Sequence, residues 1–200
     1  MSKSKAQRSR DKILRAATSV FAEKGFEAAS MDDIVQASGV SKGGIYWHFK
    51  SKDEMIAAVF RELFEQEIEQ MAALVVAGGS ASERLAQIMR ASVADVQVLD
   101  AELPFTLEIY AQAARQEALG EVLQAYFSRY HAMLTELVAQ GVAQGEFRPV
   151  DPADTALTLM SLFEGLLLLW VFSHDALDLS RQVEASLSLL LAGIGPPPTQ

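Results

Sequence analysis

The strongest constraint on what this chain can fold into is a dense series of helix start and stop signals in its first 55 residues. Apolar residues recur there at helical spacing in a first stripe: Ile13, Leu14, Ala17, Val20 and Phe21. This stripe stops at Gly25, because glycine adopts the left-handed conformation of a helix end at the lowest cost. Ser30 and Asp33 form a capping box for a second helix, which Gly39 ends, and Ser41 caps a third.

The second and third predicted helices meet across residues 38–41, a short turn containing glycine that is typical of a helix-turn-helix. On the third helix, Ile45 and Phe49 share one face. The other face carries glycines and aromatic residues: Gly43, Gly44, Tyr46 and Trp47. Glycine in a helix costs about 1 kcal/mol relative to alanine, so local stability does not explain this pair. Close approach of this helix to the DNA major groove explains the two glycines. For the two aromatic residues, core packing is the alternative.

Charge is distributed unevenly along the chain. The net charge is −9, yet residues 1–52 carry ten basic and five acidic side chains, whereas the remainder carries seven and 21. Every lysine lies in the first 52 residues. This contrast indicates a basic partner-binding module joined to an acidic body, although a solvated basic tail would give the same numbers.

Several classes of function are excluded by composition. The chain has no cysteine and only three histidines, His48, His131 and His174. A Cys/His zinc site, an iron–sulfur cluster, a thiol nucleophile and a disulfide framework therefore cannot form. We find no nucleophile elbow and no phosphate-binding G-x-x-x-x-G-K-[ST] loop, so we expect neither an enzyme nor a cofactor or metal. No secretory signal opens the chain, and a reducing compartment is compatible with its composition.

Long helices are predicted beyond the first three, without strand alternation. The clearest apolar stripe covers residues 119–138 and is closed by Gly141. Asp151 caps the next helix, which is apolar almost all round. This stretch of about 17 residues contains Glu164, and a membrane span normally needs about 20 apolar residues, so a buried helix that also contacts a second subunit is the better explanation. The last stripe, residues 179–191, would share that interface.

Aromatic, methionine and acidic residues of the helical body form a candidate effector pocket. Its predicted residues are Met89, Phe105, Glu108, Tyr110, Tyr126, Phe127, Tyr130, Met160, Phe163, Glu164 and Trp170. Ordinary core packing is the alternative for each of them. Glu108 and Glu164 stand in apolar segments and need a partner, which could be Arg115, Arg129, a cationic ligand or solvent. An acyl chain or an apolar drug fits the same residues as well as a cation does.

The N-terminal residues closely resemble the TetR/AcrR family of bacterial transcriptional repressors. The resemblance rests on Ile13-Leu14-Arg15-Ala16-Ala17, Phe21-Ala22-Glu23-Lys24-Gly25-Phe26, Ser30, Ile34, residues 39–49 (GVSKGGIYWHF) and Ser51-Lys52, and residues 141–151 and Gly165 also look like the family. It implies an all-α homodimer with about nine helices in each chain. Each chain would have a three-helix helix-turn-helix head and a C-terminal body, which binds a ligand and dimerises through its last two helices. We therefore expect a DNA-binding domain at residues 1–52, an effector-binding and dimerisation domain at 53–194 and a disordered tail at 195–200.

The predicted DNA-contacting residues are Ser30, Ser41, Lys42, Gly43, Gly44, Tyr46, Trp47, His48, Lys50 and Lys52. By similarity, Ser30 and Lys52 would contact phosphates and the third helix would read bases, while a packing role for His48 is an open alternative. Many family members carry a polar or basic residue where this chain has Asp32 and Asp33, so base contacts from the second helix are not expected. The basic arm from Lys3 to Arg10 could add phosphate or minor-groove contacts.

Together these features predict a cytoplasmic, nucleoid-associated bacterial repressor that binds a palindromic operator as a homodimer and is released by a small, largely apolar effector. No membrane partner is expected. The alternatives are a constitutive or architectural DNA-binding protein without an effector, and an all-helical enzyme or small-molecule carrier with an incidental basic N-terminus.

Overall fold

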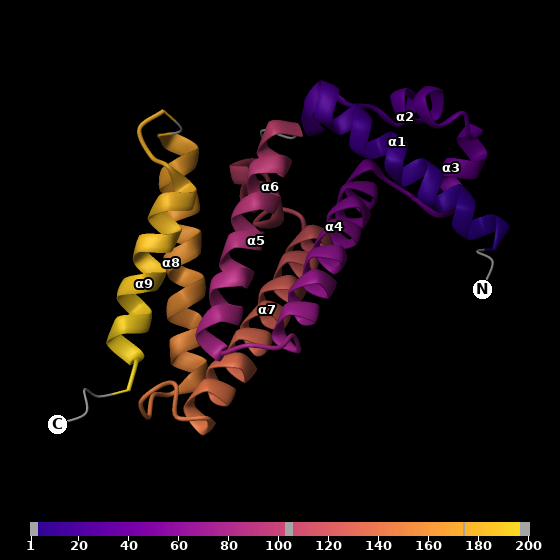
Figure 1. The fold of residues 1–200 in the computed structure, drawn as a ribbon. Coiled ribbons are helices and arrows are strands. Elements are labelled where there is room, and N and C mark those ends of the chain that lie inside the picture. Colours follow the sequence, from indigo (N-terminus) through magenta and orange to yellow (C-terminus); the bar gives the residue numbers. More distant parts are fainter. Residues whose placement is uncertain (1–3, 103–105, 174, 197–200) are drawn as a thin grey trace. The chain divides into compact units, whose positions relative to one another are not determined.

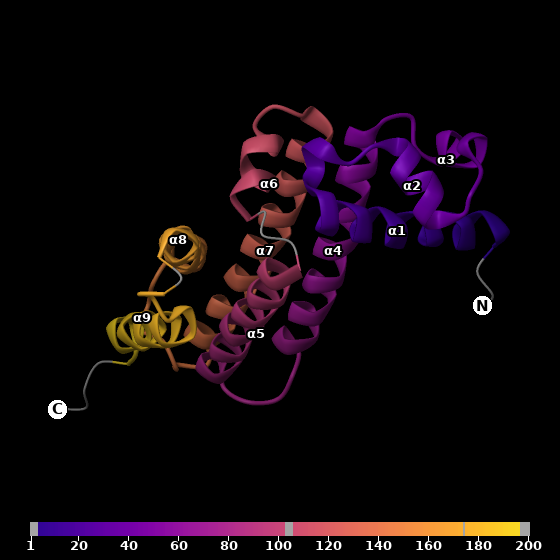
Figure 2. The same cartoon turned by 90° about the horizontal axis from the view of Figure 1, so that it is seen from above.

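The computed structural model describes residues 4–102, 106–173 and 175–196, and within them the chain is entirely α-helical (Figures 1 and 2). These described residues form nine helices: α1 (Lys5–Ala28), α2 (Met31–Ser38), α3 (Lys42–His48), α4 (Lys52–Val75), α5 (Ala81–Glu102), α6 (Thr106–Ala113), α7 (Glu117–Ala143), α8 (Pro152–Phe172) and α9 (Leu179–Ile194). The expected fold class, an N-terminal helix-turn-helix followed by a helical domain, is confirmed.

The chain forms two compact units. The first contains Met1–Glu65 and Asp100–Gln124, and the second contains Gln66–Leu99 and Ala125–Gln200. Packing therefore divides α4 after residue 65 and assigns α6 to the same unit as the helix-turn-helix. The functional division at residue 52 remains a prediction, and the predicted tail lies partly outside the described residues, at 197–200.

The predicted helix signals of the first unit are present. Ser30 Oγ accepts from the Asp33 amide at 3.2 Å, and the Asp33 carboxylate accepts from the Ser30 amide at 2.9 Å, which completes the capping box. Gly39 ends α2 in the left-handed conformation (φ 60°, ψ 19°), and Ser41 Oγ accepts from the Gly44 amide. Gly25 has a positive φ of 78°, but the chain resumes helical geometry as far as Ala28, so α1 kinks there instead of ending.

Most of the basic N-terminal arm is helical. Ser4 caps α1, and the basic residues from Lys5 to Arg10 lie in its first turns. Arg10 lies over the ring of Phe49 at 5.6 Å, which brings this first turn against the residue that follows α3.

The first unit has one apolar core. Its helix-turn-helix part is built on Ile13, Phe21, Phe26, Ile34, Ile45, Phe49 and Phe60, which are all at least 98% buried. The ring of Phe26 folds back on Phe21, with centroids 5.3 Å apart, and meets Phe60 edge-on at 5.7 Å. Ile109 of α6 and Leu119 and Val122 of α7 belong to the same core.

The second unit packs the C-terminal part of α4 with α5, most of α7, α8 and α9. α8 is the one helix of the described residues that is long and apolar enough to cross a membrane. Its buried residues nevertheless belong to the core of this unit: Ala156, Leu159, Met160, Phe163, Leu167 and Trp170. α9 packs beside it (Figures 1 and 2). The core position of these residues supports the buried-helix explanation.

The end of α7 differs from its prediction. The helix continues through Gly141 to Ala143, and Gly145 takes the positive φ, of 75°. Gly141 is required for a different reason: a Cβ atom there would overlap the ring of Phe147, which is 96% buried. The glycine therefore makes room for a core aromatic residue within a helix.

Replacing Gly141 by alanine should destabilise the protein by about 1–3 kcal/mol, because the Phe147 ring is held in the core and Ala81 closes the other side of the site. Gly193→Ala in α9 is the matched control, since open space surrounds that position. We expect it to be neutral or stabilising by up to about 1 kcal/mol. Thermal and urea unfolding would compare the two, and equal stabilities would show that Phe147 moves freely.

Candidate nucleic-acid interface and effector region

Helix α3 separates its buried and exposed faces as predicted. Ile45 is fully buried and Phe49 is 2% exposed, whereas Trp47 is 67% and Tyr46 38% exposed. Large aromatic side chains normally contribute apolar area to a core, so their exposure on one short helix marks a contact surface. The core-packing alternative for these two residues is therefore wrong for the free protein.

The two glycines of α3 are present for different structural reasons. A Cβ atom at Gly44 would lie 2.9 Å from Val40 Cγ1 and 3.2 Å from Ser41 Oγ, so the tight turn itself requires glycine there. At Gly43 a Cβ atom would meet nothing within 4 Å. Since nothing in the described chain requires glycine at position 43, only this glycine supports close approach by an external surface.

Lys24, near the end of α1, and Lys42, at the start of α3, are paired with the two aspartates of α2. Lys42 Nζ lies 2.8 Å from the Asp32 carboxylate, and Lys24 Nζ lies 2.6 Å from that of Asp33. The hydrogen bonds from Lys24 and then Ser30 lower the pKa of Asp33 to about 2. Both pairs are solvent-exposed, and exposed pairs contribute little to stability. Asp32 instead orients the ammonium of Lys42 at the N-terminal end of α3.

His48 is half-buried between aromatic neighbours. Its ring meets that of Trp47 edge-on, with centroids 4.5 Å apart. Burial and the charge of Arg10 lower the pKa of His48 below its usual range, so the neutral ring is favoured. These contacts give His48 a packing role against Trp47, and the predicted phosphate contact remains untested.

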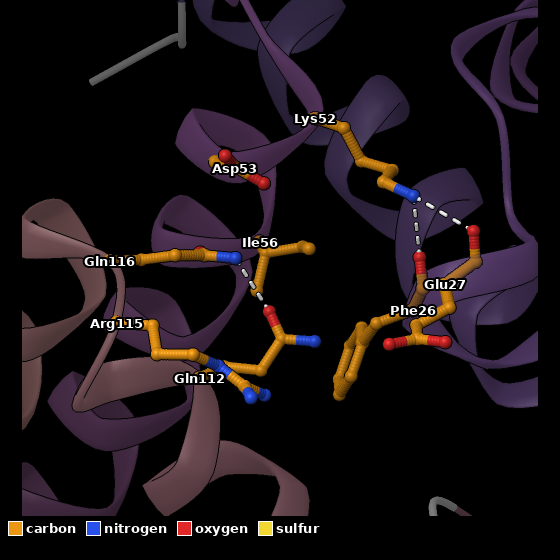
Figure 3. A pocket seen from close by; sticks show the side chains of 8 residues that line it. All are labelled: Phe26, Glu27, Lys52, Asp53, Ile56, Gln112, Arg115 and Gln116. Carbon is orange, nitrogen blue, oxygen red and sulfur yellow. Dashed lines mark hydrogen bonds between the residues drawn. The ribbon is translucent and has the colours of Figure 1, made fainter.

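Lys52, a predicted phosphate contact, is engaged inside the head. Its Nζ donates to the carbonyl oxygens of Phe26 at 2.7 Å and of Glu27 and Ala29 at 3.0 Å (Figure 3 shows the first two). All three ammonium donors are thereby used, which ties the first residue of α4 to the end of α1. A phosphate contact from Lys52 would have to replace one of these bonds.

The remaining predicted contacts also have local partners. Lys50 Nζ donates to the carbonyl of Tyr46 at 2.9 Å, at the C-terminal end of α3, and Ser30 is held in its capping box. Ser51 Oγ accepts from the Glu54 amide, but the Glu54 carboxylate accepts from Lys50 instead of Ser51. At the start of α4, Glu54 therefore closes its capping interaction with the residue before Ser51.

The predicted effector residues fall into two groups. Seven of those in the second unit lie in or against its core: Met89, Tyr126, Phe127, Tyr130, Met160, Phe163 and Trp170. Glu164 belongs to the same unit. Glu108 and Tyr110 belong to the first unit instead, and Phe105 lies outside the described residues. Glu108 accepts from Gln112 Nε2 at 3.2 Å, so a neighbouring amide supplies a partner that the sequence interpretation had not considered.

A half-buried polar pair in the second unit was not predicted from the sequence. Tyr126 Oη donates to Glu67 Oε1 at 2.9 Å. Burial raises the pKa of Glu67 to about 7, and the charges of Asp95 and Glu164 act in the same direction. A signal for Glu67 existed, because it lies three residues after Phe64 and four before Met71, on the apolar stripe of α4.

A helix-turn-helix head with an exposed aromatic recognition helix, joined in one chain to a helical body, defines a DNA-binding transcription regulator. Residues 13–59 match the profile of the bacterial regulatory proteins of the tetR family, and residues 81–194 match the C-terminal domain of BetI-type transcriptional repressors. The chain belongs to the TetR family, whose members are not enzymes and bind DNA operators and small-molecule effectors.

Relatives with similar sequences and structures cover nearly the whole chain. The HTH-type transcriptional regulator YfiR of Bacillus subtilis is 30% identical over 182 residues, which are 87% of this chain and 86% of YfiR. The fold is similar to that of SmeT of Stenotrophomonas maltophilia in its triclosan complex (TM-score 0.79, 25% identity, 96% and 94% of the two chains). It is also similar to Bacillus subtilis FadR in complex with stearoyl-CoA (TM-score 0.73, 26% identity, 92% and 98%).

Proposed function

We propose that this regulator is a ligand-responsive repressor that binds a palindromic operator as a homodimer in the bacterial cytoplasm. The observation that carries the proposal is the exposed aromatic face of α3, with open space at Gly43 beside it. Each head would place α3 in a major groove, with Lys42, Gly43, Tyr46 and Trp47 nearest the bases. Ser41 and Lys50 would contact the backbone from the two ends of the helix.

An exposed apolar stripe on α8 supports dimerisation. Leu157 is 55%, Leu168 48% and Phe172 74% exposed, and their spacing places them on one side of the helix. Gly165 lies on the same side, and a Cβ atom there would meet nothing within 4 Å. A glycine inside a helix costs about 1 kcal/mol, which close packing of a partner helix would offset. With Leu189 of α9, 77% exposed, this stripe is the proposed homodimer interface.

The effector would bind in the second unit. SmeT and FadR, which share this fold, have been solved with triclosan and stearoyl-CoA, two ligands with large apolar parts. The aromatic and methionine side chains around Tyr126 and Tyr130 suit an apolar ligand body, and Glu67 offers it a hydrogen-bonding group. A largely apolar effector that carries a donor or a positive charge fits this environment best.

Operator affinity with and without ligand tests the proposal. In a population-shift mechanism, DNA and the effector favour different arrangements of the two heads. The affinity for the operator then changes by no more than the effector's preference for one arrangement over the other. We expect an inducer to weaken binding by about 5- to 150-fold, the usual size of such coupling. A panel of acyl-CoAs, phenolic biocides and lipophilic cations covers the ligand classes considered. Unchanged affinity across the panel would indicate a constitutive DNA-binding protein.

Glu67 should make stability depend on pH. Its pKa is about 7 in the folded protein and near the ordinary 4.5 when unfolded, so the folded state binds more protons between these values. The contribution of Glu67 to the free energy of unfolding is therefore fully present below pH 4.5. It is lost as pH rises through 7, and the loss is roughly 3 kcal/mol at most. Glu67→Gln should therefore flatten the pH profile of the melting temperature between pH 5 and 8. Glu69→Gln, exposed on the same helix, is the control, and an equally flattened profile there would contradict the assignment.

A further inference from the structure

A polar pocket of about 260 Å³ lies within the first compact unit, and none of the residues that line it was predicted to bind the effector (Figure 3). It is lined by Phe26, Glu27, Lys52, Asp53, Ile56, Gln112, Arg115 and Gln116. These residues come from the end of α1, the start of α4 and the junction between α6 and α7. The volume is slightly below the roughly 300–1,000 Å³ of drug-sized sites, so it suits a small metabolite.

The inner wall of the pocket is preorganised. Phe26 and Ile56 are at least 98% buried and supply an apolar surface. Gln116 Nε2 donates to Gln112 Oε1 at 2.6 Å, and Gln112 in turn donates to the Glu108 carboxylate. Because an ionised carboxylate only accepts, Glu108 fixes the direction of this ladder and the orientation of both amides. Gln116 Oε1 is left buried without a hydrogen-bond partner among the described residues, so the wall has one unused acceptor.

Three of the four charged side chains around the pocket are available to a ligand. The fourth, Lys52, is not, because its ammonium already donates to three carbonyls. The exposed side chains of Arg115, Glu27 and Asp53 have no hydrogen bond or ion pair with other described residues. Arg115 enters from the α6–α7 turn and Glu27 from α1 (Figure 3). The pocket therefore offers a bidentate cation and two carboxylates from different elements, together with the bound charge of Lys52.

We propose that this pocket is a second ligand site, which binds a small zwitterion of the amino-acid type. The ligand carboxylate would pair with Arg115, its ammonium with Glu27 and Asp53, and its side chain would cover Phe26 and Ile56. Two positive and two negative side chains surround the site, so a molecule with both charges separated fits better than an anion or a cation. Occupancy would join α1 and α4 to the α6–α7 turn by contacts that the free protein lacks.

Calorimetric titration of the intact protein without DNA tests the site. The probes are free amino acids of graded side-chain size, their N-acetyl derivatives, which lack the ammonium, and their decarboxylated amines. At least one amino acid should bind saturably, and both derivatives should bind about tenfold or more weakly because each loses one charged pair. Arg115→Ala and Asp53→Asn should each weaken binding about tenfold. Both side chains are exposed, so these variants should keep the fold.

Arg129→Ala is the matched control, since this arginine is exposed on α7 in the other unit and does not line the pocket. Its affinity for the amino acid should equal that of the wild type. The proposal is overturned if no amino acid binds, if the two derivatives bind equally well, or if Arg115→Ala binds like Arg129→Ala. Because DNA is absent, such a failure leaves the proposed repressor function untouched.

Discussion

Trp47→Ala is expected to weaken specific operator binding strongly while leaving the fold and the dimer intact. Trp47 is two-thirds exposed on α3, so its removal costs the free protein little packing. On DNA, a lost base contact costs about 1–3 kcal/mol, and a dimer loses the contact twice. Specific affinity should therefore fall by at least about 30-fold, as measured by fluorescence anisotropy on a labelled operator. Binding to random DNA should change little, because phosphate contacts persist.

Val76→Ala is the control for this experiment, because Val76 is 82% exposed in the turn after α4, outside the helix-turn-helix. It should bind the operator with wild-type affinity. Retention of full sequence-specific affinity by Trp47→Ala would show that α3 does not present Trp47 to the bases. Circular dichroism and sedimentation of both variants exclude loss of fold or of assembly as the cause.

Leu168→Glu is expected to convert the dimer to monomers. Leu168 lies on the exposed stripe of α8 between Leu157 and Phe172, and a carboxylate buried in a twofold interface would face its own copy. Analytical ultracentrifugation should give the mass of one chain at micromolar concentration. Operator affinity should fall by about 10²- to 10⁴-fold, because two linked heads gain their affinity from effective concentration.

The matched control is Val76→Glu, which places the same charge on an exposed apolar residue outside the proposed interface. This variant should remain a dimer with unchanged operator affinity. A Leu168→Glu protein that sediments as a dimer would place the interface elsewhere and would leave the apolar stripe of α8 without an explanation.

Local signals allowed much of the fold to be predicted from the sequence. The Ser30–Asp33 capping box, the left-handed Gly39 and the Asp151 cap of α8 all stand as expected. Each depends on atoms within three or four residues, so sequence spacing alone is sufficient. Gly141 was misinterpreted as a helix end because the reason for glycine there, the ring of Phe147, lies outside the helix.

The candidate sites were predicted less completely. The faces of α3 followed from periodicity, but the sequence did not distinguish Gly44, which the turn requires, from Gly43, which faces open space. Glu67 was missed, although its position between Phe64 and Met71 signalled a carboxylate on an apolar face. Its pKa depends on burial and on Tyr126, Asp95 and Glu164, which lie on three other helices.

The sequence by itself determined where most helices begin and end, which face of each is apolar, and that positive charge gathers in the first 52 residues. These properties repeat over one or two helical turns and are therefore encoded locally. Only the tertiary structure decided that Lys52 is bound by the end of α1, that Glu108 belongs with the head, and that Arg115 stands beside a pocket with Glu27. Each of these depends on contacts between residues at least 23 positions apart or on how helices distant in sequence pack, which spacing along one helix cannot specify.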